Sequence, residues 1–249
     1  MRLVWTYNSN PPTINDESKK ILMLNFYILS ISRAKKYGHY TVIYTDLESS
    51  KHFYNLADEV YILNPSNKTL LWDGFKISAL ENEKNDFALI DGDIILETKL
   101  PELNNEMYID AIEYNSWEVE YALNVEELTN LKIKDLIPEW ENKKTPIINT
   151  GFLYIKDRDF RMLYLDRFKK YGDFIYKNKE HLSNKNRACM GAQYLLGLLC
   201  EKNNITPTCM SEKFSEKNNY YKHYVGNIKY QSPPVPSTHI IQFQSKIFI

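Results

Sequence analysis

Cysteine is scarce in this chain, which limits the covalent and metal chemistry to expect. Only Cys189, Cys200 and Cys209 occur among the 249 residues. Three cysteines cannot all pair, and their spacing matches no zinc pattern. Neither a disulfide framework nor a zinc module is therefore expected, and a reducing compartment is favoured.

Long apolar runs and an excess of one charge are also missing. No stretch approaches the roughly 18 apolar residues of a membrane-spanning helix, and the first residues, MRLVWTYNSNPP, lack the apolar core of a signal peptide. The 31 basic residues face 32 acidic ones, for a net charge of −1, so no overall field favours nucleic acid or an anionic membrane. We expect a cytoplasmic protein that does not bind nucleic acid and has no transmembrane segment.

What the chain does contain is an alternation of strand-like and helical segments. The expected strands cover residues 2–7, 40–44, 59–63 and 87–90, and the expected helices cover residues 17–37, 49–56 and 69–83. Such alternation is typical of a parallel sheet with helices on both faces.

The second half of the chain is more mixed. Strands are expected at residues 108–112 and 146–155, and helices at residues 118–131, 159–171 and 188–199, before a proline-punctuated tail from residue 231. No repeat, low-complexity linker or boundary interrupts the chain. The predicted fold class is therefore α/β, with a mixed, mostly parallel central sheet in a single domain spanning residues 1–249.

Two carboxylates follow the fourth expected strand, in the sequence FALIDGDIIL. In open α/β sheets, ligands bind beyond the carboxyl ends of the strands. If the backbone stays extended, Asp91 and Asp93 project to the same side, and at about 4 Å they repel by ~4 kcal/mol at an effective dielectric near 20. Gly92 between them would allow a ligand or metal to approach closely.

A pair of this kind requires a cation. Carboxylate oxygens suit Mg²⁺ or Mn²⁺, which commonly bridge a protein to a substrate phosphate. An ordinary strand-end turn is the alternative, because Asp-Gly is common there. Arginine or lysine bridges that lock both acids would contradict a metal site.

Two enzyme classes use such a pair. In haloacid-dehalogenase-like phosphatases the first aspartate, here Asp91, is the nucleophile, but the motif usually lies on the first strand and a later acidic pair completes the Mg²⁺ site. In nucleotide-sugar glycosyltransferases of the GT-A type the pair closes the nucleotide-binding half and holds a metal against the diphosphate. The position of Asp91 after three earlier strands favours the second class.

The chain resembles GT-A glycosyltransferases, and in particular glycosyltransferase family 8, over most of its length. The segments that carry the resemblance are short, and they agree in order and approximate spacing: WTYNSN, WDGFKISAL, LIDGDIIL, PIINTGFLYI, CMGAQYLL and THIIQFQSK. The resemblance implies a Rossmann-like GT-A fold in which about residues 1–100 form the nucleotide-binding half and about residues 101–249 the acceptor side.

The resemblance also implies roles for individual residues. Asp91 and Asp93, together with His239, would bind Mn²⁺ or Mg²⁺, with Asp93 the more direct ligand of the two acids. Gln193 would lie beside the anomeric carbon. The residues implied to hold the nucleotide sugar are Thr6, Tyr7, Asn8, Lys76, Asp91, Asn149, Thr150, Gly151 and Lys246.

Two departures from family 8 concern the later motifs. Gly191 and Ala192 precede Gln193, where the family often has an acidic residue. The family's late motif reads His, two residues, Gly, two residues, Lys, whereas no glycine lies between His239 and Lys246, and their spacing is longer.

The function implied is metal-dependent transfer of a sugar from a nucleoside diphosphate, UDP by default, to the hydroxyl of a glycan, lipid-linked or protein acceptor. Similarity to family 8 favours retention of the anomeric configuration. An inverting enzyme would need a general base, for which Asp110, Glu113, Glu118 and Glu120 are candidates. The phosphatase and a non-catalytic nucleotide-sugar-binding protein remain the alternatives.

Overall fold

The computed structural model describes residues 1–9, 16–63, 74–113, 122–182, 191–211 and 218–224. A seven-stranded sheet forms its centre, in the order β3-β2-β1-β4-β7-β6-β8. Its strands are β1 (Arg2–Tyr7), β2 (Tyr40–Thr45), β3 (Glu59–Ile62), β4 (Phe87–Ile90), β6 (Met107–Glu113), β7 (Ile147–Ile155) and β8 (Thr208–Cys209).

The sheet is mixed and mostly parallel, as predicted. β1 is parallel to β2 and β4, β2 to β3, and β6 to β8, whereas β7 is antiparallel to both of its neighbours, β4 and β6. One sheet therefore contains strands from both halves of the chain, and β7 runs against the direction of its neighbours.

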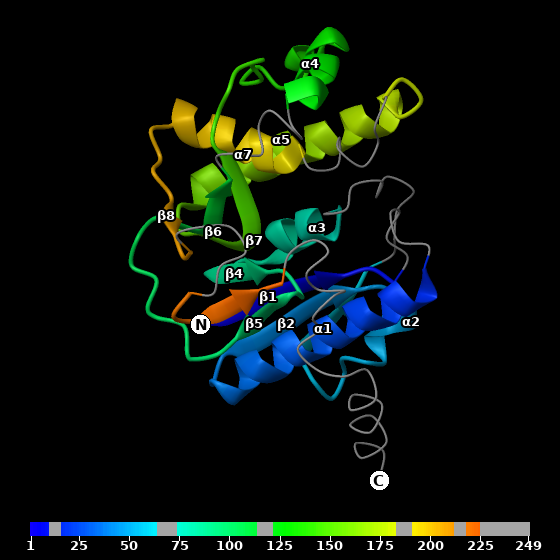
Figure 1. Ribbon diagram of the computed structural model, residues 1–249, viewed down its shortest axis with the longest axis vertical. Coiled ribbons are helices and arrows are strands. Elements are labelled where there is room, and N and C mark those ends of the chain that lie inside the picture. The colour runs from blue at the N-terminus through cyan, green and yellow to red at the C-terminus, as the bar shows by residue number, and fades with distance from the viewer. Residues whose placement is uncertain (10–15, 64–73, 114–121, 183–190, 212–217, 225–249) are drawn as a thin grey trace.

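Helices cover both faces of this sheet (Figure 1). They are α1 (Glu17–Lys36), α2 (Leu47–Ser50), α3 (Gly74–Asn82), α4 (Ala122–Asn130), α5 (Arg158–Asn178) and α7 (Gly191–Lys202). Period-two alternation along the strands explains how both faces are packed. Val4 and Val42 join the apolar core with α3, α5 and α7, whereas Leu3, Trp5 and Ile43 join the core under α1.

Helix ends follow local capping chemistry. The Asp16 carboxylate accepts hydrogen bonds from the first turn of α1, and Gly38, at φ 78°, follows its C-cap. Asp46 caps α2 in the same way, but the helix ends at Ser50 and not near residue 56 as expected. α5 continues seven residues past its expected end.

A second, two-stranded sheet was not expected from the sequence. β5 (Ile94–Leu96) pairs antiparallel with β9 (Tyr221–His223), so that Ile94 lies opposite His223. β5 begins directly after the Asp-Gly-Asp segment and packs against α1. A short strand from the end of the chain is thereby joined to the exit of β4. Within the described residues, no helix has both the length and the hydropathy to cross a bilayer.

Candidate active site

The acidic segment forms a turn at the exit of β4. β4 ends at Ile90, and the amide of Ile94 donates to the carbonyl of Asp91 over 3.1 Å. The amide of Asp91 also donates to the carbonyl of Gly151 on β7, at 2.8 Å. The expectation of an extended backbone at residues 91–93 is therefore wrong, because the chain turns here to enter β5.

A neighbouring side chain requires a glycine at position 92. A Cβ atom at this position would lie 2.2 Å from the ring of Tyr27 on α1. Tyr27 in turn contacts the ring of Tyr7, at a centroid distance of 4.9 Å. The aromatic packing beneath the turn therefore leaves no room for a side chain at this position.

A histidine completes the acidic pair. One donor atom each of Asp91, Asp93 and His223 lies within 4.8 Å of the others, and this is the group of potential metal ligands that the described residues contain. Nε2 of His223 lies 3.4 Å from Oδ1 of Asp93. Asp93 and His223 are buried, whereas Asp91 is partly exposed. Pairing of β9 with β5 brings the histidine to this position from 130 residues further along the chain.

Behind His223 lies a buried polar network. Nδ1 of His223 contacts a carboxylate oxygen of Asp110 at 2.7 Å, and the Tyr221 hydroxyl donates to the other oxygen, also at 2.7 Å. Burial lowers the pKa of His223, but the carboxylates of Asp93 and Asp110 outweigh it and raise the pKa to about 10. Burial and the Asp110 carboxylate raise the pKa of Tyr221. Asp110 is thus held inside the protein by its hydrogen bonds, which does not suit the role of general base for an acceptor.

Lys76 reaches the acidic turn from α3. Its ammonium lies 2.8 Å from Oδ1 of Asp91 and 3.5 Å from the carbonyl of Thr150. The lysine is buried. One of the two acids is therefore engaged by a lysine, the kind of contact that counts against a metal at that oxygen. A carboxylate has two oxygens and about four lone pairs, so one ammonium group leaves lone pairs that can still bind a metal ion.

β7 supplies the expected Asn149, Thr150 and Gly151 beside this turn. The Asn149 side chain donates to Glu113 and accepts from the amide of Gly151, both at 2.8 Å. A Cβ atom on Gly151 would lie 2.5 Å from Cε1 of His223. Gly151 therefore provides the space for the imidazole. Glu113, another candidate base, is buried and bonded to Asn149, and Glu118 and Glu120 lie outside the described residues.

The remaining predicted residues lie on other elements of the fold. Thr6 and Tyr7 end β1, and Asn8 follows. Tyr7 is a core side chain between Tyr27 and Phe53, and burial raises its pKa. Gln193 lies on α7 and is partly buried. His239 and Lys246 fall outside the described residues.

His223 was missed by the sequence reasoning although a signal was present. The residues from His223 to Lys229 read HYVGNIK, so that His223, Gly226 and Lys229 match the family 8 pattern of His, two residues, Gly, two residues, Lys without departure. His239, the histidine first assigned to this motif, precedes a strand-like apolar run in the tail. Only His223 of this heptapeptide's three motif residues is described structurally.

Comparison with protein families identifies the chain's relatives by sequence. Residues 18–246 match the family of unknown function DUF6734. The chain belongs to this family. No curated protein matches the sequence.

Solved structures similar to this DUF6734 chain include glycosyltransferases. Galactosyltransferase LgtC, in complex with donor and acceptor sugar analogs, is 11% identical, with a TM-score of 0.42 over 77% of this chain and 70% of that chain. An active-site mutant of LgtC is 10% identical, with a TM-score of 0.45 over 77% and 69%. Mouse xyloside xylosyltransferase 1, in its apo form, is 9% identical, with a TM-score of 0.41 over 82% of each chain. Similarity at this level does not decide what the chain binds, so the functional argument depends on the site.

The donor set fits a divalent cation. Two carboxylates and one imidazole lie close enough to share an ion, and a mixed oxygen and nitrogen set suits Mn²⁺ better than Mg²⁺, which prefers oxygen. Nδ1 of His223 faces Asp110 and Nε2 faces Asp93. Because these carboxylates raise the pKa of His223, Nε2 would ligate an ion only by releasing its proton. A carboxylate that orients a histidine from behind is the usual outer shell of a metal site.

Proposed function

We propose that this chain is a metal-dependent glycosyltransferase whose donor substrate is a nucleoside-diphosphate sugar, specifically a UDP-sugar. The observation that carries the proposal is the convergence of Asp91 and Asp93 with His223, the residue that opens the sequence HYVGNIK. The acids follow a central strand, at the edge where α/β sheets bind ligands. A strand-end turn without a ligand would not require a distant histidine beside it.

Asp91, Asp93 and His223 would hold Mn²⁺, or Mg²⁺, and His223 takes the place first expected for His239. Such an ion supplies positive charge where the departing diphosphate gains negative charge. Lys76 is close enough to Asp91 to share a ligand with it and would add a second positive charge on the phosphate side. Asn149, Thr150 and Gly151 would form the floor under the sugar, with Thr6, Tyr7 and Asn8 beside the nucleoside.

The reaction proposed is attack of an acceptor hydroxyl on the anomeric carbon. The bond from this carbon to the diphosphate breaks, a bond to the acceptor oxygen forms, and the hydroxyl proton leaves with the diphosphate or to solvent. Gln193 would lie beside the anomeric carbon, and retention of configuration follows the family 8 pattern. Asp110 and Glu113 are both buried and paired, so neither supports an inverting mechanism.

A thermal-shift screen of nucleoside diphosphates, with and without Mn²⁺, tests the proposal. We expect UDP to stabilise the protein only when Mn²⁺ is present, by roughly 2.7 kcal/mol at a hundredfold excess over its dissociation constant. His223→Ala and Asp93→Ala should abolish the Mn²⁺-dependent shift and the turnover of UDP-sugars. His181→Ala, which removes an exposed histidine, is the matched control and should change neither.

The same samples separate the alternatives. A phosphatase would form a phosphoaspartate at Asp91, which beryllium fluoride would trap. A non-catalytic binder would show the UDP shift without transfer or hydrolysis across a wide acceptor panel. Undiminished transfer by Asp93→Ala would contradict the proposed site outright.

A further inference from the structure

A cavity of about 560 Å³ lies over β2 and β3, away from the acidic turn. Ligand sites for small molecules commonly measure about 300–1,000 Å³. Its walls come from the start of β1, from β2 and β3, and from the residues that end α3 and lead to β4. The cavity is therefore large enough for a sugar of one or two rings.

The cavity shares no lining residue with the acidic turn or β7, although Tyr44 in its wall lies opposite Thr6 on β1. Arg2, in its wall, opens β1 and lies opposite Phe87, four residues before Asp91 on the neighbouring strand. Four strand residues span about 13 Å. The lining residues include none of those assigned to the acidic turn or to β7.

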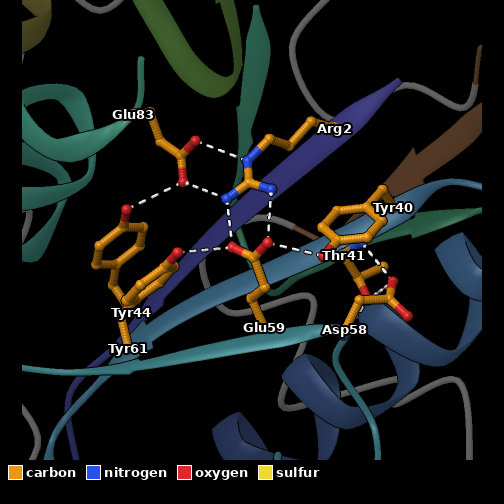
Figure 2. Close-up of polar contacts among 8 residues, drawn as sticks. All are labelled: Arg2, Tyr40, Thr41, Tyr44, Asp58, Glu59, Tyr61 and Glu83. Carbon is orange, nitrogen blue, oxygen red and sulfur yellow. Dashed lines mark hydrogen bonds and ion pairs between the residues drawn. The ribbon is translucent and has the colours of Figure 1, made fainter. Parts of the chain in front are cut away.

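A network of fixed polar groups forms the wall (Figure 2). The Arg2 guanidinium donates to Glu59 on one side and to Glu83 on the other, with shortest distances of 2.6 and 2.7 Å. Three tyrosine hydroxyls donate to the same carboxylates: Tyr40 and Tyr61 to Glu59, and Tyr44 to Glu83. These side chains hold one another in position before any ligand arrives, which reduces the entropy cost of binding.

The direction of these hydrogen bonds determines what the wall can offer. Each hydroxyl has one proton and two lone pairs. Because the protons of Tyr44 and Tyr61 are donated to glutamates, their lone pairs remain to accept hydrogen bonds from a ligand. Asn82, Lys84 and Asn85 add donors to the same lining. The cavity thus combines acceptors and donors, as a ligand rich in hydroxyl groups requires.

Charge in the lining is balanced. Arg2 and Lys84 carry two positive charges, and Glu59 and Glu83 carry two negative ones. The Arg2 guanidinium is bonded to both carboxylates, so these three charges satisfy one another. Neither a phosphate nor a metal ion is favoured, whereas a neutral ligand meets no opposing charge.

One ring gives the cavity an exposed aromatic surface. Tyr61 stacks on Tyr44 with a centroid distance of 4.9 Å and an interplanar angle of 19°. Tyr44 is buried, but Tyr61 is 43% exposed. Aromatic rings combine an apolar face with a polar edge. A pyranose has the matching surfaces, since its C–H face is apolar and its edge carries hydroxyls.

We propose that this cavity is a binding site for a neutral saccharide, formed by Tyr61 and the residues around Arg2. The site is distinct from the candidate active site, and saccharide binding there does not depend on glycosyl transfer.

Titrations of the full chain with lactose, maltose and N,N′-diacetylchitobiose test the proposal. Binding is measured by calorimetry, and its location by chemical shifts in protein labelled at tyrosine. We expect millimolar binding of at least one disaccharide that shifts Tyr44 and Tyr61 and weakens tenfold or more in Tyr61→Ala. Tyr54→Ala, which removes another exposed tyrosine outside the lining, is the matched control and should bind normally.

Two further samples separate this site from the active site. Asp93→Ala should keep saccharide binding, and Tyr61→Phe, which keeps the ring but loses the hydroxyl, should bind more weakly than the unmodified chain and more tightly than Tyr61→Ala. Binding lost in Asp93→Ala but kept in Tyr61→Ala would overturn the proposal. So would uridine displacing the disaccharide from the tyrosines, or the absence of binding by all three sugars.

Discussion

Lys76 contacts the acidic turn and the backbone of β7 at once, which makes its charge the nearest described positive charge to Asp91. Two functions are compatible with this position. The ammonium can neutralise Asp91 as a purely structural ion pair, or it can move a short distance to a phosphate when a nucleotide binds. These two functions predict opposite consequences when the charge is removed.

Lys76→Met separates them. Removing a positive charge from Asp91 should tighten Mn²⁺ binding in the absence of nucleotide, by about three- to tenfold. The same change should weaken UDP binding at saturating Mn²⁺ by about tenfold, equivalent to ~1.4 kcal/mol. Calorimetric titrations measure both, with Lys51→Met on an exposed turn as the control. Weaker Mn²⁺ binding together with unchanged UDP binding would show that Lys76 only positions Asp91.

Gly151 controls the room available to His223. Gly151→Ala places a methyl group 2.5 Å from Cε1 of the imidazole, so the ring has to move. We expect a loss of about 1–3 kcal/mol of stability and a weaker affinity for Mn²⁺. Gly197→Ala is the control, because its Cβ would meet the carbonyl oxygen of Pro146 at 2.1 Å, away from the cluster. Equal Mn²⁺ affinities in the two variants would contradict the role of His223.

At the scale of elements, the sequence pattern predicted the strands with periodic apolar residues and missed the very short strand β9. β1, β2, β4 and β7 have apolar runs whose period is readable, and each was found within about two residues. β9 is three residues long and contains a lysine and a histidine, so it has no pattern of its own. Its position depends on backbone pairing with β5, a contact across more than 120 residues.

The same difference explains the candidate site. Asp91 and Asp93 could be predicted because they follow a buried strand in an alternating chain. The position of His223 beside them could not be predicted from strand patterns, since it depends on tertiary pairing, and only the spacing of His223, Gly226 and Lys229 pointed to it. The contact between Gly92 and Tyr27 on α1 could not be predicted, because it joins residues that are distant in the sequence.

Asp110 connects two of these elements, β6 and β9. Its carboxylate accepts from Tyr221 and contacts Nδ1 of His223, so it acts as a positioning residue for the imidazole. Asp110→Asn keeps the shape of the side chain but replaces the carboxylate by an amide. The amide can turn its NH2 group toward Nδ1 of His223, and it then accepts no hydrogen bond from this nitrogen. We expect Mn²⁺ affinity, measured by electron paramagnetic resonance titration, to fall about 10- to 100-fold.

A purely structural role for Asp110 would give a different result. Tyr221→Phe removes one hydrogen bond from the same carboxylate while its ring can still stack on Phe152, at a centroid distance of 5.9 Å. This control should cost about 1 kcal/mol of stability and leave Mn²⁺ affinity nearly unchanged. If both variants lost the same stability and neither lost affinity, Asp110 would not position His223.

At the scale of the whole molecule, the two halves share one sheet and the apolar cores on its two faces. Leu89 on β4 lies opposite Leu153 on β7, and both belong to the apolar cluster that also contains Val4 and Tyr194. Trp5 and Trp140 lie buried in the cores on opposite faces of this sheet. A chain built in this way should unfold in a single transition, although its halves carry different parts of the proposed chemistry.

Unfolding at low pH tests whether the two halves unfold together, because the edge of the sheet contains the acid-sensitive ion pair of Arg2 and Glu59. Hydrogen bonds from Arg2, Tyr40 and Tyr61 lower the pKa of Glu59 to about 2, although burial opposes them. The folded-state pKa lies below the unfolded value near ~4.3, so this carboxylate stabilises the fold fully above that value and loses its contribution as the pH falls through about 2.

Glu59→Gln should therefore reduce the fall in stability between about pH 4.5 and 2. At pH 7 it should cost only about 1 kcal/mol, since the Glu59 side chain is 31% exposed and solvent screens the pair. Urea unfolding at several pH values measures both effects, with the exposed Glu102→Gln as the control.

In protein labelled with 5-fluorotryptophan, the resonances of Trp5 and Trp140 should shift to unfolded positions at the same urea concentration. Separate midpoints for the two tryptophans would mean that the shared sheet does not couple the halves.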